Sequence, residues 1–206
     1  MSGIFITMEG PDGSGKSTQI ELLKDYLSEK GYDIIVTREP GGTQISEKIR
    51  QIILDKENEK MSDMTELMLY VAARAQLVDE VIKPALDKNQ VVISDRFVDS
   101  SAVYQGIARG LGTKLVYEMN QYAISRMPDI TFLLDLDAKE GIKRKKHQAA
   151  LDRLELEKLS FHEKVVEGYR SLAQEQDRIV LIDATLPKET IFERIISVLQ
   201  ERKIMK

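Results

Sequence analysis

The sequence contains no cysteine and only two histidines, His147 and His162. The absence of cysteine excludes disulfides, thiolate catalysis and cysteine-ligated zinc or iron–sulfur sites. Two histidines also argue against a multi-histidine metal site, and neither has an assigned role. No apolar run approaches the roughly 20 residues that a membrane span needs, and the N-terminus shows no export signal. We therefore expect a cytoplasmic protein with no membrane partner.

The sequence also lacks a strong excess of either charge. Its 30 lysines and arginines face 34 aspartates and glutamates, which gives a net charge of −4. That balance argues against a protein whose surface binds nucleic acid. With 206 residues, the chain is long enough to form one domain with a large core. No repeat or linker divides it, so we expect a single domain over residues 1–206.

Short apolar runs alternate with longer amphipathic stretches along the chain. The runs predict strands at residues 4–8, 34–37, 91–94, 130–136 and 179–182. Helical spacing predicts helices at 16–30, 45–53, 65–86 (with Pro84 able to kink or end it), 115–126, 139–146, 154–174 and 188–203. Residues 106–112 are expected to form a glycine-rich loop. Strands separated by helices favour an α/β fold with a mainly parallel sheet covered on both faces.

Residues 10–17 match the phosphate-binding pattern G-x-x-x-x-G-K-S/T in full. The match is Gly10-Pro11-Asp12-Gly13-Ser14-Gly15-Lys16-Ser17, followed by Thr18, between a predicted strand and a predicted helix. The glycines let successive N–H groups point inward, and the helix N-terminus adds positive potential. We expect Lys16 to contact the β- and γ-phosphates of ATP and Ser17 to ligate Mg²⁺.

Two charged residues, Asp95 and Arg96, follow the third predicted strand. A carboxylate at that place beside a phosphate loop fits a residue on the metal side, binding directly or through water. A guanidinium there fits bidentate binding of a second phosphate. A helix cap and a surface charge remain the alternatives for these two residues.

Residues 139–153 carry six basic side chains against Glu140 and Asp152. The segment is either a solvated helix face or a lid over an anionic ligand, and we expect a lid at residues 139–155. Its basic residues are Lys139, Lys143, Arg144, Lys145, Lys146 and Arg153. We interpret Glu155, Glu157, Glu163 and Glu167 as a solvated helix face, and Met68, Leu69, Met119 and Met127 as core.

No N-K-x-D motif follows a strand, which argues against a GTPase, and the sheet is too short for a helicase or a large motor ATPase. A small kinase remains. Further blocks then make the chain resemble thymidylate kinases (dTMP kinases). The blocks are MEGPDGSGKST at 8–18, TREPGGT at 37–43, YVAAR at 70–74, DRF at 95–97, SS at 100–101, YQG at 104–106 and LDR at 151–153.

This resemblance implies a three-layer P-loop NTPase fold with strand order 2-3-1-4-5. It also implies transfer of the ATP γ-phosphoryl to dTMP with Mg²⁺, in dTTP biosynthesis, by a homodimer. Two alternatives stay open: another nucleoside or nucleotide kinase of the same fold, and a non-catalytic nucleotide-binding regulator. A mere binder has no need of a cation aimed at a transferring phosphoryl group, which weighs against the second.

The resemblance further implies a set of residues that bind dTMP. Asp12 would accept a hydrogen bond from the sugar 3′-OH, and Tyr104 would crowd the 2′ position. Tyr70, where the family usually has phenylalanine, would stack on thymine. The remaining expected contacts are Arg74, Ser101 and Gln105 on the base, and Arg38, Pro40, Arg50 and Arg96 in the monophosphate pocket. Packing in the core or an ordinary helix surface is the alternative for the aromatic and polar members.

The resemblance also bears on the cation that neutralises the transferring phosphoryl. Loop positions 11–14 contain no arginine or lysine, as in bacterial relatives that supply an arginine from the lid. We expect Arg153 to play that part, with Arg144 assisting. Relatives carry several arginines just before the Asp-Arg pair, whereas residues 147–151 here have none. Tethering of the lid to a carboxylate is the alternative role for Arg153.

Overall fold

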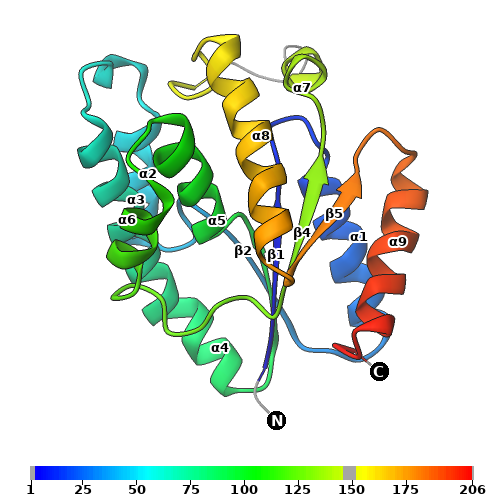
Figure 1. Ribbon diagram of the computed structural model, residues 1–206. Coiled ribbons are helices and arrows are strands. Elements are labelled where there is room, and N and C mark those ends of the chain that lie inside the picture. The colour runs from blue at the N-terminus through cyan, green and yellow to red at the C-terminus, as the bar shows by residue number, and fades with distance from the viewer. Residues whose placement is uncertain (1–2, 146–151, 206) are drawn as a thin grey trace.

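The computed structural model describes residues 3–145 and 152–205. Lys146 and His147 therefore lie outside the described residues, as does the middle of the expected lid. Figure 1 shows a central sheet with helices on both of its faces. The described strands are β1 (Ile4–Glu9), β2 (Ile34–Arg38), β3 (Val91–Asp95), β4 (Ile130–Asp135) and β5 (Ile179–Asp183). They are all parallel and lie in the order β2-β3-β1-β4-β5, which confirms the predicted topology.

The strands are short apolar runs because the three central ones are covered on both faces. β1 pairs with β3 from Ile4 opposite Val91 to Met8 opposite Asp95, and its side chains are almost fully buried. The edge strands are less well covered than the central ones, because Val36 in β2 and Leu181 in β5 are exposed.

The described helical segments sort into two layers (Figure 1). α1 and α9 cover one face, where Ile6, Leu23 and Ile195 share a core. The other segments lie on the opposite face or above the sheet, where Phe5, Leu77 and Phe97 share a second core. The segments are α1 (Lys16–Glu29), α2 (Gln44–Leu54), η1 (Lys56–Asn58), α3 (Asp63–Leu77), η2 (Val78–Ile82), α4 (Lys83–Asp87), α5 (Val98–Ser101), η3 (Ala102–Ala108), α6 (Thr113–Asn120), α7 (Ala138–Lys145), α8 (Leu159–Glu175) and α9 (Lys188–Glu201).

The long helix predicted at residues 65–86 runs through Pro84 and ends only at Asp87. It passes through the π-helical turn η2 directly before the proline. A wider turn makes room for the proline ring, which would collide with the preceding turn of a regular α-helix. Within the described residues, no helix is long and apolar enough to cross a membrane.

The expected glycine loop at 106–112 is partly wrong, because the helical chain continues through η3 to Ala108. Gly106 serves close packing rather than a turn: a Cβ there would lie 3.2 Å from the Cα of Thr113 at the start of α6. Another expectation was also wrong. Met68 is 53% exposed and does not belong to the core.

Candidate active site

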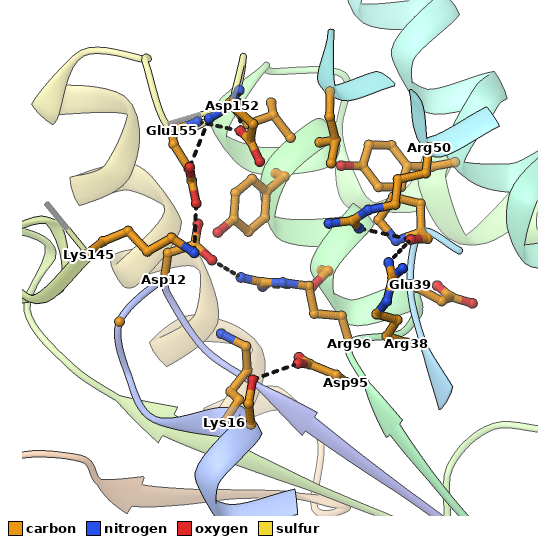
Figure 2. Close-up of a pocket in the computed structure, with 18 of the residues that line it drawn as sticks. Asp12, Lys16, Arg38, Glu39, Arg50, Asp95, Arg96, Lys145, Asp152 and Glu155 are labelled. Atoms are coloured by element: carbon orange, nitrogen blue, oxygen red, sulfur yellow. Dashed lines mark hydrogen bonds and ion pairs between the residues drawn. The ribbon is translucent and has the colours of Figure 1, made fainter. Parts of the chain in front are cut away.

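A cavity of about 350 Å³ opens at the carboxyl ends of β1, β2 and β3 (Figure 2). Ligands of parallel α/β sheets bind at this edge, where the loops after the strands meet. The cavity's lining comes from the phosphate loop, the end of β2, helices α2 and α3, the turn after β3, η3 and the lid. The lining residues are Asp12, Gly13, Gly15, Lys16, Ser17, Thr18, Arg38, Glu39, Pro40, Arg50, Leu54, Tyr70, Asp95, Arg96, Ser100, Tyr104, Gln105, Lys145, Asp152, Leu154 and Glu155.

The phosphate loop wraps around the start of α1. Gly13 has φ 78° and approaches α7 so closely that a Cβ would lie 2.5 Å from the Gly141 carbonyl oxygen. Lys16 Nζ donates to the carbonyls of Gly10 (3.1 Å) and Pro11 (3.0 Å), and its side chain is buried. Burial, followed by the charge of Arg96, lowers the pKa of Lys16 to about 8. The ammonium is thus held over the loop where it can meet a polyphosphate.

Ser17 and Asp95 lie beside the loop in a geometry that fits Mg²⁺. The Ser17 hydroxyl is 3.5 Å from Asp95 Oδ2, and Asp95 Oδ1 is buried without a hydrogen-bond partner among the described residues. A carboxylate oxygen and a hydroxyl are the hard ligands that Mg²⁺ takes, with phosphate oxygens and water completing its shell. No group of three acidic or histidine ligands occurs in the described part of the chain, so the protein itself offers no closed metal cage there.

Arg96 lies at the centre of the cavity, with a left-handed φ of 72°. Figure 2 shows its guanidinium directed at Asp12, at 2.8 Å. It also donates to the Gly10 carbonyl (3.0 Å) and to the hydroxyls of Ser100 and Tyr169 (both 3.1 Å). This set of contacts fixes a cation beside the phosphate loop. The neighbouring charges keep the pKa of Arg96 well above its usual value despite its burial.

A buried carboxylate, Glu9, underlies this arginine. Its Oε2 accepts hydrogen bonds from Ser100 Oγ (2.6 Å) and from the Tyr169 hydroxyl (2.7 Å), and its Oε1 accepts from the Phe97 N–H (2.8 Å). Burial, together with the charge of Asp99, raises the pKa of Glu9. Sequence reasoning missed Glu9 and Tyr169. A glutamate at the end of an apolar strand was the available signal for the first, and nothing marked the second.

Asp12 faces the cavity as a permanent acceptor. Burial alone would raise the pKa of this carboxyl, but the charges of Arg96, Lys16 and Lys145 outweigh it and hold the pKa at about 2. An ionised carboxylate accepts hydrogen bonds only. The loop aspartate can therefore receive a hydroxyl but offers no proton.

The residues expected to contact the base divide into two groups. Tyr70 and Gln105 line the cavity, as does Tyr104, which was expected beside the sugar, whereas Arg74 and Ser101 do not. Arg74 is buried and donates to Glu39 (2.8 Å), to Asn120 (2.6 Å) and to the Ser101 hydroxyl (3.0 Å). It thus lies one layer behind the cavity surface and is joined to it by Glu39, another residue that sequence reasoning missed.

The expected phosphate-pocket residues Arg38 and Arg50 lie together at one side of the cavity (Figure 2), and Pro40 also lines the cavity. Both arginines donate to the Pro40 carbonyl, at 3.2 Å from Arg38 and 2.9 Å from Arg50. The Glu39–Pro40 peptide bond is cis. Arg38 also pairs with Glu47 at 2.9 Å.

Neither of the lid arginines that were assigned to the site, Arg144 and Arg153, lines the cavity, whereas a neighbouring lysine does. Lys145 lines it and pairs with Glu155 at 3.0 Å. Arg144 bonds Glu140 and the Ala184 carbonyl instead. Lys145, which was not assigned a site role, thus lies nearer to the phosphate loop than Arg144 does.

Arg153 is not among the residues that line the cavity. Its Nη2 contacts Glu66 at 2.5 Å and its Nε donates to the Ile53 carbonyl at 2.8 Å. This is the kind of contact that the tethering alternative describes, and it leaves a catalytic role for Arg153 as a prediction. Glu155 was wrongly placed on a solvated helix face, because the chain turns at residues 152–156 and α8 begins only at Leu159.

Comparison with known proteins agrees with this geometry. The family model described as thymidylate kinase matches residues 8–195. The chain belongs to the thymidylate kinase family. It is 49% identical to the thymidylate kinase of Finegoldia magna over 98% of this chain and 100% of that one. It is 47% identical to that of Geobacillus thermodenitrificans over 98% and 92%. The crystal structure of thymidylate kinase from Ehrlichia chaffeensis covers 97% of this chain and 99% of its own, with a TM-score of 0.79 and 32% identity.

Membership of the thymidylate kinase family makes this chain a transferase of nucleotide biosynthesis that phosphorylates dTMP with ATP as donor. The fold, three layers around a parallel sheet in the order 2-3-1-4-5, is that of the P-loop NTPases. The non-catalytic regulator considered from the sequence is set aside.

Proposed function

We propose that the cavity in Figure 2 holds both substrates and that the ATP γ-phosphoryl passes there to dTMP, giving dTDP and ADP. One observation carries this proposal. The same cavity is lined by the phosphate loop with Lys16 and by two groups suited to a pyrimidine base, the ring of Tyr70 and the amide of Gln105.

The donor nucleotide is assigned to residues 10–18. Backbone N–H groups of the loop and the N-terminus of α1 provide positive potential for the phosphates. Lys16 contributes a full positive charge, and Arg144, which bonds Glu140 and the Ala184 carbonyl in the structure, would leave these partners to contact the nucleotide from the lid. Ser17 and Asp95 would hold Mg²⁺, which supplies charge neutralisation and fixes the orientation of the phosphates.

The acceptor nucleotide is assigned to the other half of the cavity. Asp12 receives the sugar 3′-OH, since its low pKa keeps it an acceptor. Tyr70 stacks on the base, while Gln105 Oε1, buried and without a partner among the described residues, accepts its N–H. Arg38, Arg50 and Arg96 bind the monophosphate around Pro40. Arg74 and Ser101 support the base from behind this surface.

The chemistry needs no covalent enzyme intermediate. The attacking oxygen belongs to a phosphate that is already anionic, so no strong general base is needed. The protein's part is alignment together with neutralisation of the charge that spreads over the transferring group. Lys16, Arg96 and a lid cation perform that neutralisation.

A panel of acceptors tests the proposal. We expect ATP consumption to depend on an added acceptor and dTMP to give the highest kcat/KM among dTMP, dUMP, dCMP, dGMP and thymidine. A higher kcat/KM with thymidine or with a purine monophosphate would assign this fold to a different acceptor. ATP consumption that is independent of any acceptor would contradict the transfer.

Tyr104 is expected to exclude ribonucleotides. It lines the cavity and its ring packs edge-on against Phe161 and Tyr169, so it is held rigidly. Tyr104→Ala should raise kcat/KM for 5-methyl-UMP relative to dTMP several-fold, because about 1 kcal/mol of lost crowding already has that effect. Tyr104→Phe separates the ring from the hydroxyl, and a melting temperature monitors stability. If the ratio of kcat/KM for 5-methyl-UMP to that for dTMP is unchanged in both variants, Tyr104 only packs in the core and does not exclude ribonucleotides.

Arg153 is expected to supply the lid cation once it leaves Glu66. Arg153→Ala should slow the chemical step at least about tenfold, equal to about 1.4 kcal/mol, with dTMP affinity nearly unchanged. Pre-steady-state quench measures that step directly. If only the KM for ATP changes, Arg153 is a ground-state contact and Lys145, which already lines the cavity, becomes the candidate.

We also propose one kinase domain over residues 1–206 with its lid at 139–155, acting in the cytoplasm as a homodimer.

Exposed apolar side chains on the adjacent helices α2 and α3 support the dimer: Ile45, Ile52 and Met68 are 50%, 47% and 53% exposed. Sedimentation equilibrium tests it, with Ile52→Asp as the variant expected to give monomers.

A further inference from the structure

Glu66 on α3 is a buried carboxylate that three side chains bond. Its side chain is 1% exposed. Oε1 accepts from Gln105 Nε2 at 2.8 Å, and Oε2 accepts from Arg109 at 3.2 Å and from Arg153 at 2.5 Å. Burial alone would raise the pKa of Glu66, but these hydrogen bonds and the charge of Arg109 outweigh it and lower the pKa. Glu66 is therefore ionised near neutral pH and can only accept.

The acceptor-only character of Glu66 decides which way the Gln105 amide faces. A glutamine amide has a donor end and an acceptor end, and only hydrogen bonding distinguishes them. With Nε2 committed to Glu66, Oε1 is left facing the other way. Gln105 is 1% exposed and lines the cavity, and its Oε1 is buried with no partner among the described residues. An unpartnered buried acceptor calls for a donor from the ligand.

We propose that Glu66 is a positioning residue that sets the pyrimidine specificity of this kinase by locking the Gln105 amide with its oxygen toward the base. The locked oxygen accepts the N3–H of thymine. It repels cytosine, whose N3 is itself an acceptor. The inference rests on the proposed function, because it takes dTMP as the acceptor in this cavity.

A purely structural role for Glu66 makes a different prediction. In that role Glu66 pairs with Arg109 and Arg153, so its loss lowers stability or loosens the lid and affects every acceptor alike. In the positioning role its loss changes the choice between bases. The ratio of kcat/KM for dTMP to kcat/KM for dCMP separates the two roles.

The experiment replaces the carboxylate by its neutral isostere. In Glu66→Gln the new side chain can donate as well as accept, so the Gln105 amide can turn its NH₂ toward the cavity. The ratio of kcat/KM for dTMP to kcat/KM for dCMP should fall at least tenfold, because KM for dTMP rises and kcat/KM for dCMP increases. A uniform loss for both nucleotides with the ratio unchanged would overturn the proposal.

Two controls remove the effects of lost ion pairs. Glu157→Gln deprives Arg109 of another carboxylate, which lies 2.5 Å away, without touching Gln105, and should leave the ratio unchanged. In a Gln105→Ala background, Glu66→Gln should cause no further change in the ratio. A further change in that background would mean that Glu66 does not act through Gln105, and would also overturn the proposal.

Glu66→Asp keeps an acceptor-only side chain and serves as the conservative variant. Its ratio should stay within about threefold of wild type even where KM rises, and this expectation keeps the proposal falsifiable if Glu66→Gln does not fold. Loss of discrimination in Glu66→Asp would contradict the proposal. The acceptor preference of the wild-type enzyme tests the proposed function separately from the Glu66 variants. A wild-type enzyme that does not favour dTMP would contradict the proposed function itself.

Discussion

Lys16→Ala should reduce phosphoryl transfer by at least about 10²–10³-fold, since a donor aimed at developing transition-state charge typically contributes this much. Affinity for dTMP should survive, because Lys16 Nζ lies over the carbonyls of Gly10 and Pro11 in the donor half of the cavity. Calorimetric titration with dTMP checks the binding, and a quenched single turnover checks the chemistry. Lys24→Ala, at an exposed position of the same helix, is the matched control.

The lowered pKa of Lys16 adds a pH signature to this prediction. The charged form binds the phosphates, and its pKa without nucleotide is about 8. As pH rises above 8, an increasing fraction of Lys16 is neutral and must take up a proton on binding. Wild-type ATP affinity should therefore fall by up to about tenfold per pH unit above 8, and the fall should be absent in Lys16→Ala. Equal loss of dTMP affinity and of rate in Lys16→Ala would contradict the donor-side assignment.

Sequence reasoning correctly predicted the features that a short continuous segment of the chain determines by itself. The phosphate loop needs eight consecutive residues, and each strand needs a short apolar run. The strand order also followed, because the resemblance covered the blocks at the ends of β1, β2 and β3. These segments carry their own signals, so neither distant contacts nor packing had to be known.

The residues that were missed depend on contacts between distant parts of the chain. Glu9 meets Ser100 and Tyr169, and Glu39 meets Arg74. In the sequence Glu39 looks like any other acidic residue, and Glu9 is marked only by its place at the end of an apolar strand. Only the folded structure shows that they are buried, and burial is what turns an acidic side chain into a fixed partner for a functional cation.

The prediction of a helix that begins at residue 154 was wrong for a local reason, and the sequence did contain the signal for it. Asp152 Oδ1 accepts hydrogen bonds from the N–H groups of Leu154 and Glu155, both at 2.9 Å, and holds the chain in a turn. Aspartate often caps turns in this way. The apolar spacing that follows suggested a helix from residue 154, and it outweighed the turn signal. As a result, Glu155 was expected in solvent although it lines the cavity.

Arg96→Gly should slow the chemical step at least as much as Lys16→Ala does. An added arginine on the transferring phosphoryl contributes about 10³–10⁵ in phosphate-loop enzymes, so we expect a loss of at least about 10³-fold. Glycine is the appropriate replacement because residue 96 has a left-handed φ of 72°, which glycine adopts without strain. Arg96→Lys keeps the charge but loses the planar fork that reaches several acceptors, and should recover only part of the rate.

The controls for Arg96 separate catalysis from ground-state binding. Arg126→Ala removes a guanidinium that bonds Asp129 and the Gly3 carbonyl, outside the cavity lining, and should leave the rate unchanged. Guanidinium ion added to Arg96→Gly should restore part of the rate, since it can occupy the space beside Asp12 and Ser100 that the side chain leaves. A rise in KM for dTMP at constant kcat would instead show that Arg96 binds the acceptor equally in the ground and transition states. In that case the charge on the transferring group would be neutralised by Lys16, Mg²⁺ and the lid without Arg96.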